Sequence, residues 1–275
     1  MKLAFVDYWR THNPHAGGKN WIWEQVKDVA TLAHPWVADL LICSNYGSAW
    51  KQYPNKPMIF HNAEPDHKTD FLQLKAAAHV FGFAPDDNTR TRLPNWLFYA
   101  DERRDYTAPG HLNPEQIATR RKRILAIVTN PYCEARNSFM DAAISGGVMD
   151  SMGGWKRTHP GRIISKHPAC TLYQFVLAFE NCPQPGYTTE KIMDAINADA
   201  IPIHWGAHQT DFNPGRIISR GGFESDASLL DHVRELSRQP AKLAEIINRP
   251  AILQEQDIRP HVRGRVREVI LGMKG

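Results

Sequence analysis

Long hydrophobic runs and paired cysteines are both missing from this sequence of 275 residues. No apolar run approaches the ~20 residues that a membrane-spanning helix needs, and Asp7 comes too early for a secretory signal peptide. The four cysteines, Cys43, Cys133, Cys170 and Cys182, form no C-x-x-C pair, so neither a zinc site nor a disulfide framework is expected. The sequence therefore predicts a cytoplasmic protein, with at most a peripheral association with the inner face of a membrane.

An excess of charge of one sign is also missing. The formal net charge is +4 and the pI is near 8.8, while 42% of the residues are hydrophobic and 23% are charged. This composition is typical of a globular protein, and the mild basic excess suits an anionic ligand. The densest basic run, 120–123, is expected to be a solvated helix end or a linker, so nucleic acid is not indicated as a partner.

Strand-like and helix-like segments alternate along the chain, which is the pattern of an α/β protein. Strands are expected at 2–8, 39–44, 57–61, 124–129 and 201–205 and before 179; helices are expected at 20–33, 134–145 and 189–198; short apolar runs cover 79–83 and 93–99. A polar stretch at 100–120 is typical of a linker. The sequence thus predicts two α/β lobes, 1–115 and 120–250, with a helical tail, 251–275, that packs back toward the first lobe.

The segment 179–206, FENCPQPGYTTEKIMDAINADAIPIHWG, carries the most chemical information. A strand ends there, a loop rich in Pro and Gly follows, and Thr188 or Thr189 is a good N-cap for a helix that begins near Glu190. A helix N-terminus attracts anions, and Lys191 adds a full positive charge to the same turn. A diphosphate on the amides and Lys191 fits this pattern. On the helix signal alone, a capped surface helix with an exposed Glu–Lys pair is the favoured interpretation.

Several motifs in this chain resemble, in order, those of the α-1,3/1,4-fucosyltransferases, glycosyltransferase family ten. They are Phe179-Glu180-Asn181, Gly186-Tyr187-Thr188-Thr189-Glu190-Lys191, Ile201-Pro202-Ile203-His204-Trp205-Gly206, Asp211-Phe212-Asn213-Pro214, and Val128-Thr129-Asn130-Pro131 with Arg136-Asn137-Ser138-Phe139. His204 stands where the family usually has tyrosine. The similarity is dense over 128–214 and patchy but collinear elsewhere.

The resemblance implies a GT-B fold, in which two Rossmann-like lobes face a central cleft, with GDP-fucose held by the second lobe and the acceptor met mostly by the first. By position, the residues that would bind the donor are Arg136 and Lys191 at the diphosphate, with Asn181, Tyr187, Thr189 and Glu190 at the nucleotide or the sugar; Glu190 is also counted as catalytic. Metal-dependent glycosyltransferases generally use a D-x-D motif, which this sequence lacks. Arg136, Lys191 and the helix N-terminus would then neutralise the departing GDP without a metal or another cofactor.

The family's catalytic base is a glutamate in a turn of the first lobe, and this chain departs from that pattern. The turn here is Phe60-His61-Asn62-Ala63-Glu64-Pro65, with His61 in the place of the glutamate. Histidine is a competent base near neutral pH, while Glu64 supplies a carboxylate three residues later. Both are therefore candidates for the base. Trp9, Trp21, Trp23 and Trp155 could stack on sugars, although the helical spacing of Trp21 and Trp23 favours packing.

The resemblance implies a bacterial-type inverting fucosyltransferase of glycan biosynthesis. It would transfer L-fucose from GDP-fucose to a hydroxyl of an oligosaccharide or polysaccharide, with N-acetylglucosamine or N-acetyllactosamine and an α-1,3 linkage as the expectation. Two alternatives stay open: a transferase of another GDP-sugar, and a catalytically silent protein that binds a sugar nucleotide or a glycan.

Overall fold

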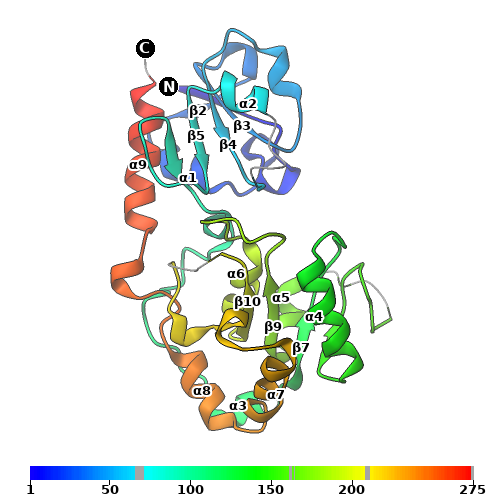
Figure 1. Ribbon diagram of the computed structural model, residues 1–275. Helices are drawn as coiled ribbons and strands as arrows, with labels where there is room; N and C mark the ends of the chain where they lie inside the picture. Colours follow the sequence, from blue (N-terminus) through cyan, green and yellow to red (C-terminus); the bar gives the residue numbers. More distant parts are fainter. Residues whose placement is uncertain (66–70, 161–162, 164, 208–210, 274–275) are drawn as a thin grey trace. The chain divides into compact units, whose positions relative to one another are not determined.

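The computed structural model describes residues 1–65, 71–160, 163, 165–207 and 211–273. These residues form two compact units. The first unit comprises 1–98, 185–187 and 258–275, and the second comprises 99–184 and 188–257. Each unit is built on its own parallel β-sheet with helices beside it (Figure 1).

The sheet of the first unit has six parallel strands in the order β2-β1-β3-β4-β5-β6. The strands are β1 Lys2–Val6, β2 Thr31–Leu32, β3 Leu40–Ser44, β4 Met58–His61, β5 His79–Gly82 and β6 Arg90–Arg92. Every residue of β3 and of β4 is buried. Continuous apolar runs of this kind are typical of parallel strands that are covered on both faces.

The first unit contains the α-helices α1 Trp21–Val26, α2 Phe71–Ala76 and α9 Arg259–Gly272. Helix α9 packs on α1 and beside the edge strand β6. Its buried residues Val262, Val266 and Ile270 recur every four positions, which places them on one face of the helix. The Arg267 guanidinium also lies 2.7 Å from the carboxylate of Asp28. The last helix of the chain is therefore part of the first unit.

The second sheet has five parallel strands in the order β11-β10-β9-β7-β8. The strands are β7 Arg121–Ala126, β8 Met149–Ser151, β9 Tyr173–Phe179, β10 Ile201–Trp205 and β11 Ile218–Ser219. The helices are α3 Pro114–Ala118, α4 Glu134–Ser145, α5 Lys166–Cys170, α6 Glu190–Asn197, α7 Asp226–Leu236 and α8 Pro240–Asn248. One face of the sheet packs on α3, α4, α7 and α8, and the other packs on α5 and α6.

Short 3₁₀-helices occupy several connections. They cover Arg10–His12, Pro14–Ala16, Pro35–Val37, Ala49–Gln52, Asn95–Tyr99, Pro214–Arg216, Arg220–Gly222 and Gln254–Gln256. The apolar run 93–99 thus forms a 3₁₀-helix. All strands within each sheet run parallel, so the loops that follow them gather at one edge, which we call the carboxyl edge.

The structure corrects some details of the sequence prediction. Helix α1 ends at Val26, well before residue 33, because β2 follows at Thr31–Leu32. The basic run is neither a helix end nor a linker, since Arg121 and Arg123 lie in β7 and both contact the buried carboxylate of Asp150.

The units also have different bounds from the lobes drawn on the sequence, 1–115 and 120–250. The chain passes into the second unit at Tyr99. The residues that follow are tied to the end of α6, where Asn197 donates to the Tyr99 carbonyl and Tyr106 donates to Asn197 over 2.6 Å. In the predicted tail, residues from Ile258 onward belong to the first unit.

Candidate functional site

A buried carboxylate organises the carboxyl edge of the second sheet. Glu180 follows the fully buried strand β9 and is itself 0% exposed. Its carboxylate accepts hydrogen bonds from the backbone N–H of Thr189 over 2.7 Å and from the Thr189 hydroxyl, and it pairs with the Lys191 ammonium over 3.0 Å. Negative charge at a helix N-terminus is favourable. Glu180 therefore fixes where α6 begins and where Lys191 points.

Thr189 occupies the N-cap position, but its hydroxyl does not cap the helix. The hydroxyl instead bonds to Glu180 and to the Lys191 ammonium, which lies 2.7 Å away. Part of the predicted anion site is thus already filled by a carboxylate of the protein.

Charges of both signs surround the first turn of α6. Burial alone would raise the pKa of Glu190, but the ammonium groups of Lys191 and Lys166 outweigh it and lower this pKa to about 2. Burial likewise disfavours the Lys191 cation, yet Glu180 and Glu190 together raise the pKa of Lys191. Lys166 also pairs with Asp194 over 2.7 Å. Both Lys191 and Glu190 are therefore charged at neutral pH.

Arg136 lies on α4 and is only 2% exposed. Its guanidinium donates to the Asn181 side-chain oxygen over 2.8 Å and to the Asn130 carbonyl over 2.7 Å. It also lowers the pKa of Lys191 through its own positive charge, so the two cations share one environment. The structure thus brings together the predicted pair Arg136 and Asn181 and connects it electrostatically with Lys191.

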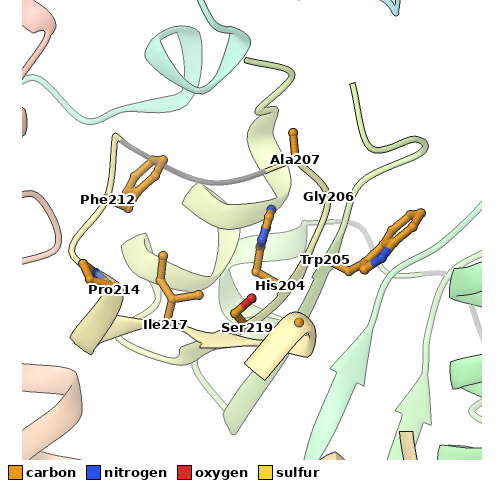
Figure 2. A pocket seen from close by; sticks show the side chains of 9 residues that line it. His204, Trp205, Gly206, Ala207, Phe212, Pro214, Ile217 and Ser219 are labelled. Atoms are coloured by element: carbon orange, nitrogen blue, oxygen red, sulfur yellow. The ribbon is translucent and has the colours of Figure 1, made fainter. Parts of the chain in front are cut away.

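A pocket of about 380 Å³ opens at the ends of β10 and β11, within the second unit (Figure 2). His204, Trp205, Gly206, Ala207, Phe212, Pro214, Ile217, Ser219 and Gly221 line it. The His204 ring projects among these residues, whereas the Trp205 side chain points away from it (Figure 2). The walls are mostly apolar, which is common in ligand pockets with a few polar groups.

His204 connects this pocket with the charged cluster. Burial first, and then the charge of Lys191, lowers the pKa of His204 to about 4, so its ring is neutral at neutral pH. Its Nε2 atom is buried and has no hydrogen-bond partner among the described residues. A Cβ atom built on Gly206 would lie 3.2 Å from the Glu180 side chain and 3.3 Å from the His204 ring, so Gly206, which lines the pocket, packs closely against Glu180.

Tyr187 is placed differently from the other predicted donor-binding residues. It belongs to the first unit, where its ring packs edge-on against Phe83 at 4.8 Å and is 2% exposed. The preceding Gly186 has a φ of 75°, and a Cβ atom there would lie 2.2 Å from the Phe83 carbonyl oxygen. Only glycine fits this turn without strain.

The candidate base turn follows β4 at the carboxyl edge of the first sheet. His61 is the last residue of β4 and is 3% exposed. Its ring is stacked between Phe98 at 4.7 Å and Tyr8 at 5.9 Å. Burial, with a smaller effect of nearby His12, lowers the pKa of His61 to about 3. Glu64 is half-buried in the same turn.

The sequence motifs located the residues around α6, but they missed what organises them. Glu180 was recognised only as part of a motif, and Lys166 and Asp194 were not singled out. Glu190 and Asp194 are four residues apart on α6, which is a spacing that puts both carboxylates on one face. Lys166 gave no comparable signal, because α5 approaches α6 only in the folded unit.

These features define a class: an α/β protein of two parallel-sheet units, with cations and a helix N-terminus at one carboxyl edge. Residues 117–248 match the model of the glycosyltransferase family 10 (fucosyltransferase) C-terminal domain. An alpha-(1,3)-fucosyltransferase of Helicobacter pylori is 32% identical over 235 residues, which cover 72% of this chain and 48% of the relative. Residues 117–248 thus form a glycosyltransferase family 10 domain, and the resemblance inferred from the motifs is confirmed.

A second curated relative aligns with this chain over a shorter segment. An alpha-(1,4)-fucosyltransferase of Arabidopsis thaliana is 36% identical over 81 residues, which cover 29% of this chain and 20% of the relative. The chain thus spans about half the length, or less, of these curated relatives.

Solved structures share the fold over nearly the whole chain. A crystal structure of an alpha1,3-fucosyltransferase with GDP-fucose has a TM-score of 0.75 at 18% identity and covers 99% of this chain and 90% of that one. Anabaena Alr3699/HepE in complex with UDP and glucose has a TM-score of 0.61 at 10% identity, over 99% of this chain and 100% of that one. The predicted α/β fold of GT-B type, with two Rossmann-like units, is confirmed.

The described part of the chain contains neither a membrane-spanning helix nor a cluster of metal-ligating side chains. Across residues 1–65, 71–160, 163, 165–207 and 211–273, no helix is long and apolar enough to cross a membrane. Within the same ranges, no group of three or more His, Cys, Asp or Glu side chains is arranged to hold a metal ion.

Two of the buried histidines, His61 and His204, predict an acid-sensitive fold. Their native pKa values, about 3 for His61 and about 4 for His204, lie below the unfolded value of about 6.5. Between about pH 6.5 and pH 4 the unfolded chain binds protons that the native state does not, so the free energy of unfolding falls as the pH falls. Each histidine contributes up to about 1.4 kcal/mol per pH unit in this window.

His61→Phe keeps the stack of rings and removes the titrating group. Urea unfolding at a series of pH values should therefore show a flatter dependence for His61→Phe than for the parent, by close to one proton. His111→Gln, at an exposed position, is the control and should keep the parent's slope. An unchanged slope in His61→Phe would show that His61 is not held neutral by burial.

Proposed function

We propose that this protein transfers L-fucose from GDP-fucose to a hydroxyl of a glycan acceptor, with inversion at the anomeric carbon and without a metal ion. The observation that carries the proposal is the cluster of Lys191, Arg136 and the start of α6, inside the matched family domain. The Helicobacter pylori relative, by its name, supports an α-1,3 linkage. An acceptor of the N-acetylglucosamine or N-acetyllactosamine type is part of the same proposal.

The donor side of the reaction requires positive charge at the leaving group. As the bond from fucose C1 to the β-phosphate oxygen breaks, GDP leaves with an added negative charge that fixed cations can stabilise. Lys191 is charged and pre-positioned by Glu180, and Arg136 is near enough for its positive charge to lower the pKa of Lys191. Glu190 is an ionised acceptor for a sugar or ribose hydroxyl. The adjacent pocket, with the neutral His204, offers room for the nucleoside part of the donor.

The acceptor side of the reaction requires a base. The acceptor oxygen bonds to C1 of fucose, and its proton leaves to the base. His61 and Glu64 remain the candidates. Burial works against His61 because an imidazolium would have to form in a water-poor site, although aromatic faces such as those of Tyr8 and Phe98 stabilise cations. A His61 base would place the acid limb of kcat/KM near 3 in the free protein, and not near the ordinary histidine value.

The central test is turnover in the presence of a chelator. We expect GDP release from GDP-fucose and N-acetyllactosamine to continue in excess EDTA, with an α-linked fucosyl product by NMR. The expectation follows from cations that are already fixed at the leaving-group site. GDP binding without any transfer would favour the catalytically silent alternative, whereas transfer from a different GDP-sugar alone would exclude fucose as the donor.

Lys191→Ala should weaken GDP binding by about one to two decades, measured by calorimetry, because a charge-assisted hydrogen bond to phosphate is worth about 1.5–3 kcal/mol. Lys242→Ala, on the exposed surface of α8, is the control and should bind like the parent. Removal of Lys191 also leaves Glu180 buried without its cation. The double variant Glu180→Gln/Lys191→Met removes both charges, and it should stay folded while GDP binding remains weak. Parent-like GDP binding by this folded double variant would place the diphosphate elsewhere.

His61→Ala should lower turnover at least about 100-fold while GDP affinity stays unchanged, since general-base catalysis is typically worth that much. Glu64→Ala is the matched comparison in the same turn. Both variants are measured for kcat and for GDP affinity under one set of conditions. If Glu64→Ala abolishes turnover while His61→Ala retains it, Glu64 is the base and His61 is a packing residue.

A further inference from the structure

Two large aromatic side chains are paired at the surface of the first unit. The rings of Trp9 and Tyr46 are 4.7 Å apart and tilted by 38°. Trp9 is 59% exposed, although a tryptophan usually buries most of its surface in a folded protein. The pair, which we call the Trp9–Tyr46 platform, therefore presents aromatic surface to solvent.

Hydrogen bonds of Asp7 and Ser44 hold the two loops that carry the platform. Asp7 has a φ of 65°, a left-handed conformation that is uncommon outside glycine. Its carboxylate accepts hydrogen bonds from the backbone N–H groups of Ala49 and Trp50, over 3.0 and 3.1 Å. The Ser44 hydroxyl donates to the Asp7 carbonyl over 2.5 Å. The loops after β1 and β3, which carry Trp9 and Tyr46, are thus fastened together.

Close contact between these loops also requires glycine at position 47. A Cβ atom on Gly47 would lie 2.3 Å from the Asp7 carboxylate oxygen. Strained or sterically restricted backbone of this kind is concentrated at functional sites. The geometry that holds Tyr46 against Trp9 is therefore specified by several residues and is not a chance surface contact.

The platform continues into the candidate base turn. β1, β3 and β4 are neighbours in the parallel sheet, so the segments after them lie along one edge. Tyr8, which precedes Trp9, stacks on His61 at 5.9 Å. Asn45, which precedes Tyr46, accepts a hydrogen bond from the Ala63 backbone N–H over 3.1 Å. Each ring of the platform is thus one residue away from a direct contact with the 61–64 turn.

We propose that the Trp9–Tyr46 platform binds a pyranose ring of the glycan acceptor. The C–H face of a sugar ring is apolar and packs on an aromatic face, while its hydroxyls remain solvated at the rim. This inference rests on the proposed function, and it adds the place where the acceptor is held in the first unit. The cations proposed to hold the donor diphosphate, Lys191 and Arg136, lie in the second unit, so we assign a sugar stacked here to the acceptor.

The same unit provides a matched control. Trp36 is 60% exposed and its ring lies 4.8 Å from that of Tyr53. Trp36 matches Trp9 in exposure and the ring separations are nearly equal, although Tyr53 is buried and Tyr46 is half-buried. Trp36 and Tyr53, however, stand shortly before the starts of β3 and β4. This second pair therefore lies away from the 61–64 turn and should not contact the acceptor.

The test measures acceptor binding and turnover in parallel. Saturation-transfer NMR with N-acetyllactosamine on the full chain should show contact to the sugar in the parent and in Trp36→Ala, but not in Trp9→Ala. The acceptor KM should rise at least about tenfold in Trp9→Ala, which corresponds to about 1.4 kcal/mol. The acceptor KM of Trp9→Phe, which keeps an aromatic face, should lie between those of the parent and of Trp9→Ala. GDP affinity should be unchanged in Trp9→Ala, Trp9→Phe and Trp36→Ala.

Parent-like acceptor binding in Trp9→Ala, or an equal loss in Trp36→Ala, would overturn the proposal. A selective loss of GDP affinity in Trp9→Ala would also overturn it, because the platform would then stack a nucleotide base. The NMR readout does not depend on catalysis. Glycan binding at Trp9 without fucose transfer would therefore disprove the proposed function and leave the platform intact.

Discussion

The arrangement of the second unit depends on one buried carboxylate. Glu180 leaves the end of β9 with no exposed surface, and its charge is offset by an amide, a hydroxyl and an ammonium group. A buried charge that loses its partner costs several kcal/mol. The start of α6, the position of Lys191 and the border of the His204 pocket are all fixed around this group. The positions of the side chains at this edge thus depend on the hydrogen bonds and the ion pair of Glu180.

The first unit uses the same device at its own carboxyl edge. Asp7 follows β1 as Glu180 follows β9, and its carboxylate accepts the N–H groups at the start of the 3₁₀-helix Ala49–Gln52, which follows β3. In both units a carboxylate just past a strand receives backbone amides of a later segment. Each loop is held in place before any ligand arrives, and preorganisation of this kind lowers the entropic cost of binding.

Sequence patterns predicted the elements whose signals are local. Helix α4 and strand β10 have the predicted bounds because their apolar periodicity is bordered by clear turn residues. Strand β7 begins earlier than predicted, since the charge of Arg121 and Arg123 is balanced by Asp150 from β8, a partner that no local pattern reveals. The motifs likewise located Arg136, Asn181 and Lys191. They could not show that Glu180 links them, because that network joins segments brought together only by folding.

The burial of His61 could not be predicted from the sequence, because it too depends on segments that only folding brings together. Its neighbours Tyr8 and Phe98 come from segments far away in the chain and stack on the His61 ring only in the folded unit. The sequence therefore indicates a histidine that can act as a base near neutral pH, whereas burial in the folded unit lowers the pKa of His61 to about 3.

The position of α9 has a consequence for how the chain is made. This helix covers the edge strand β6 and packs on α1, although the whole second unit is synthesised before it. Domains generally fold as units during synthesis, and unpaired strand edges invite aggregation. The first unit thus emerges from the ribosome with an uncovered edge and an open apolar face. The strand edge and the apolar face of the first unit stay uncovered until residues 258–275 are synthesised, when all residues of the second unit have already been made.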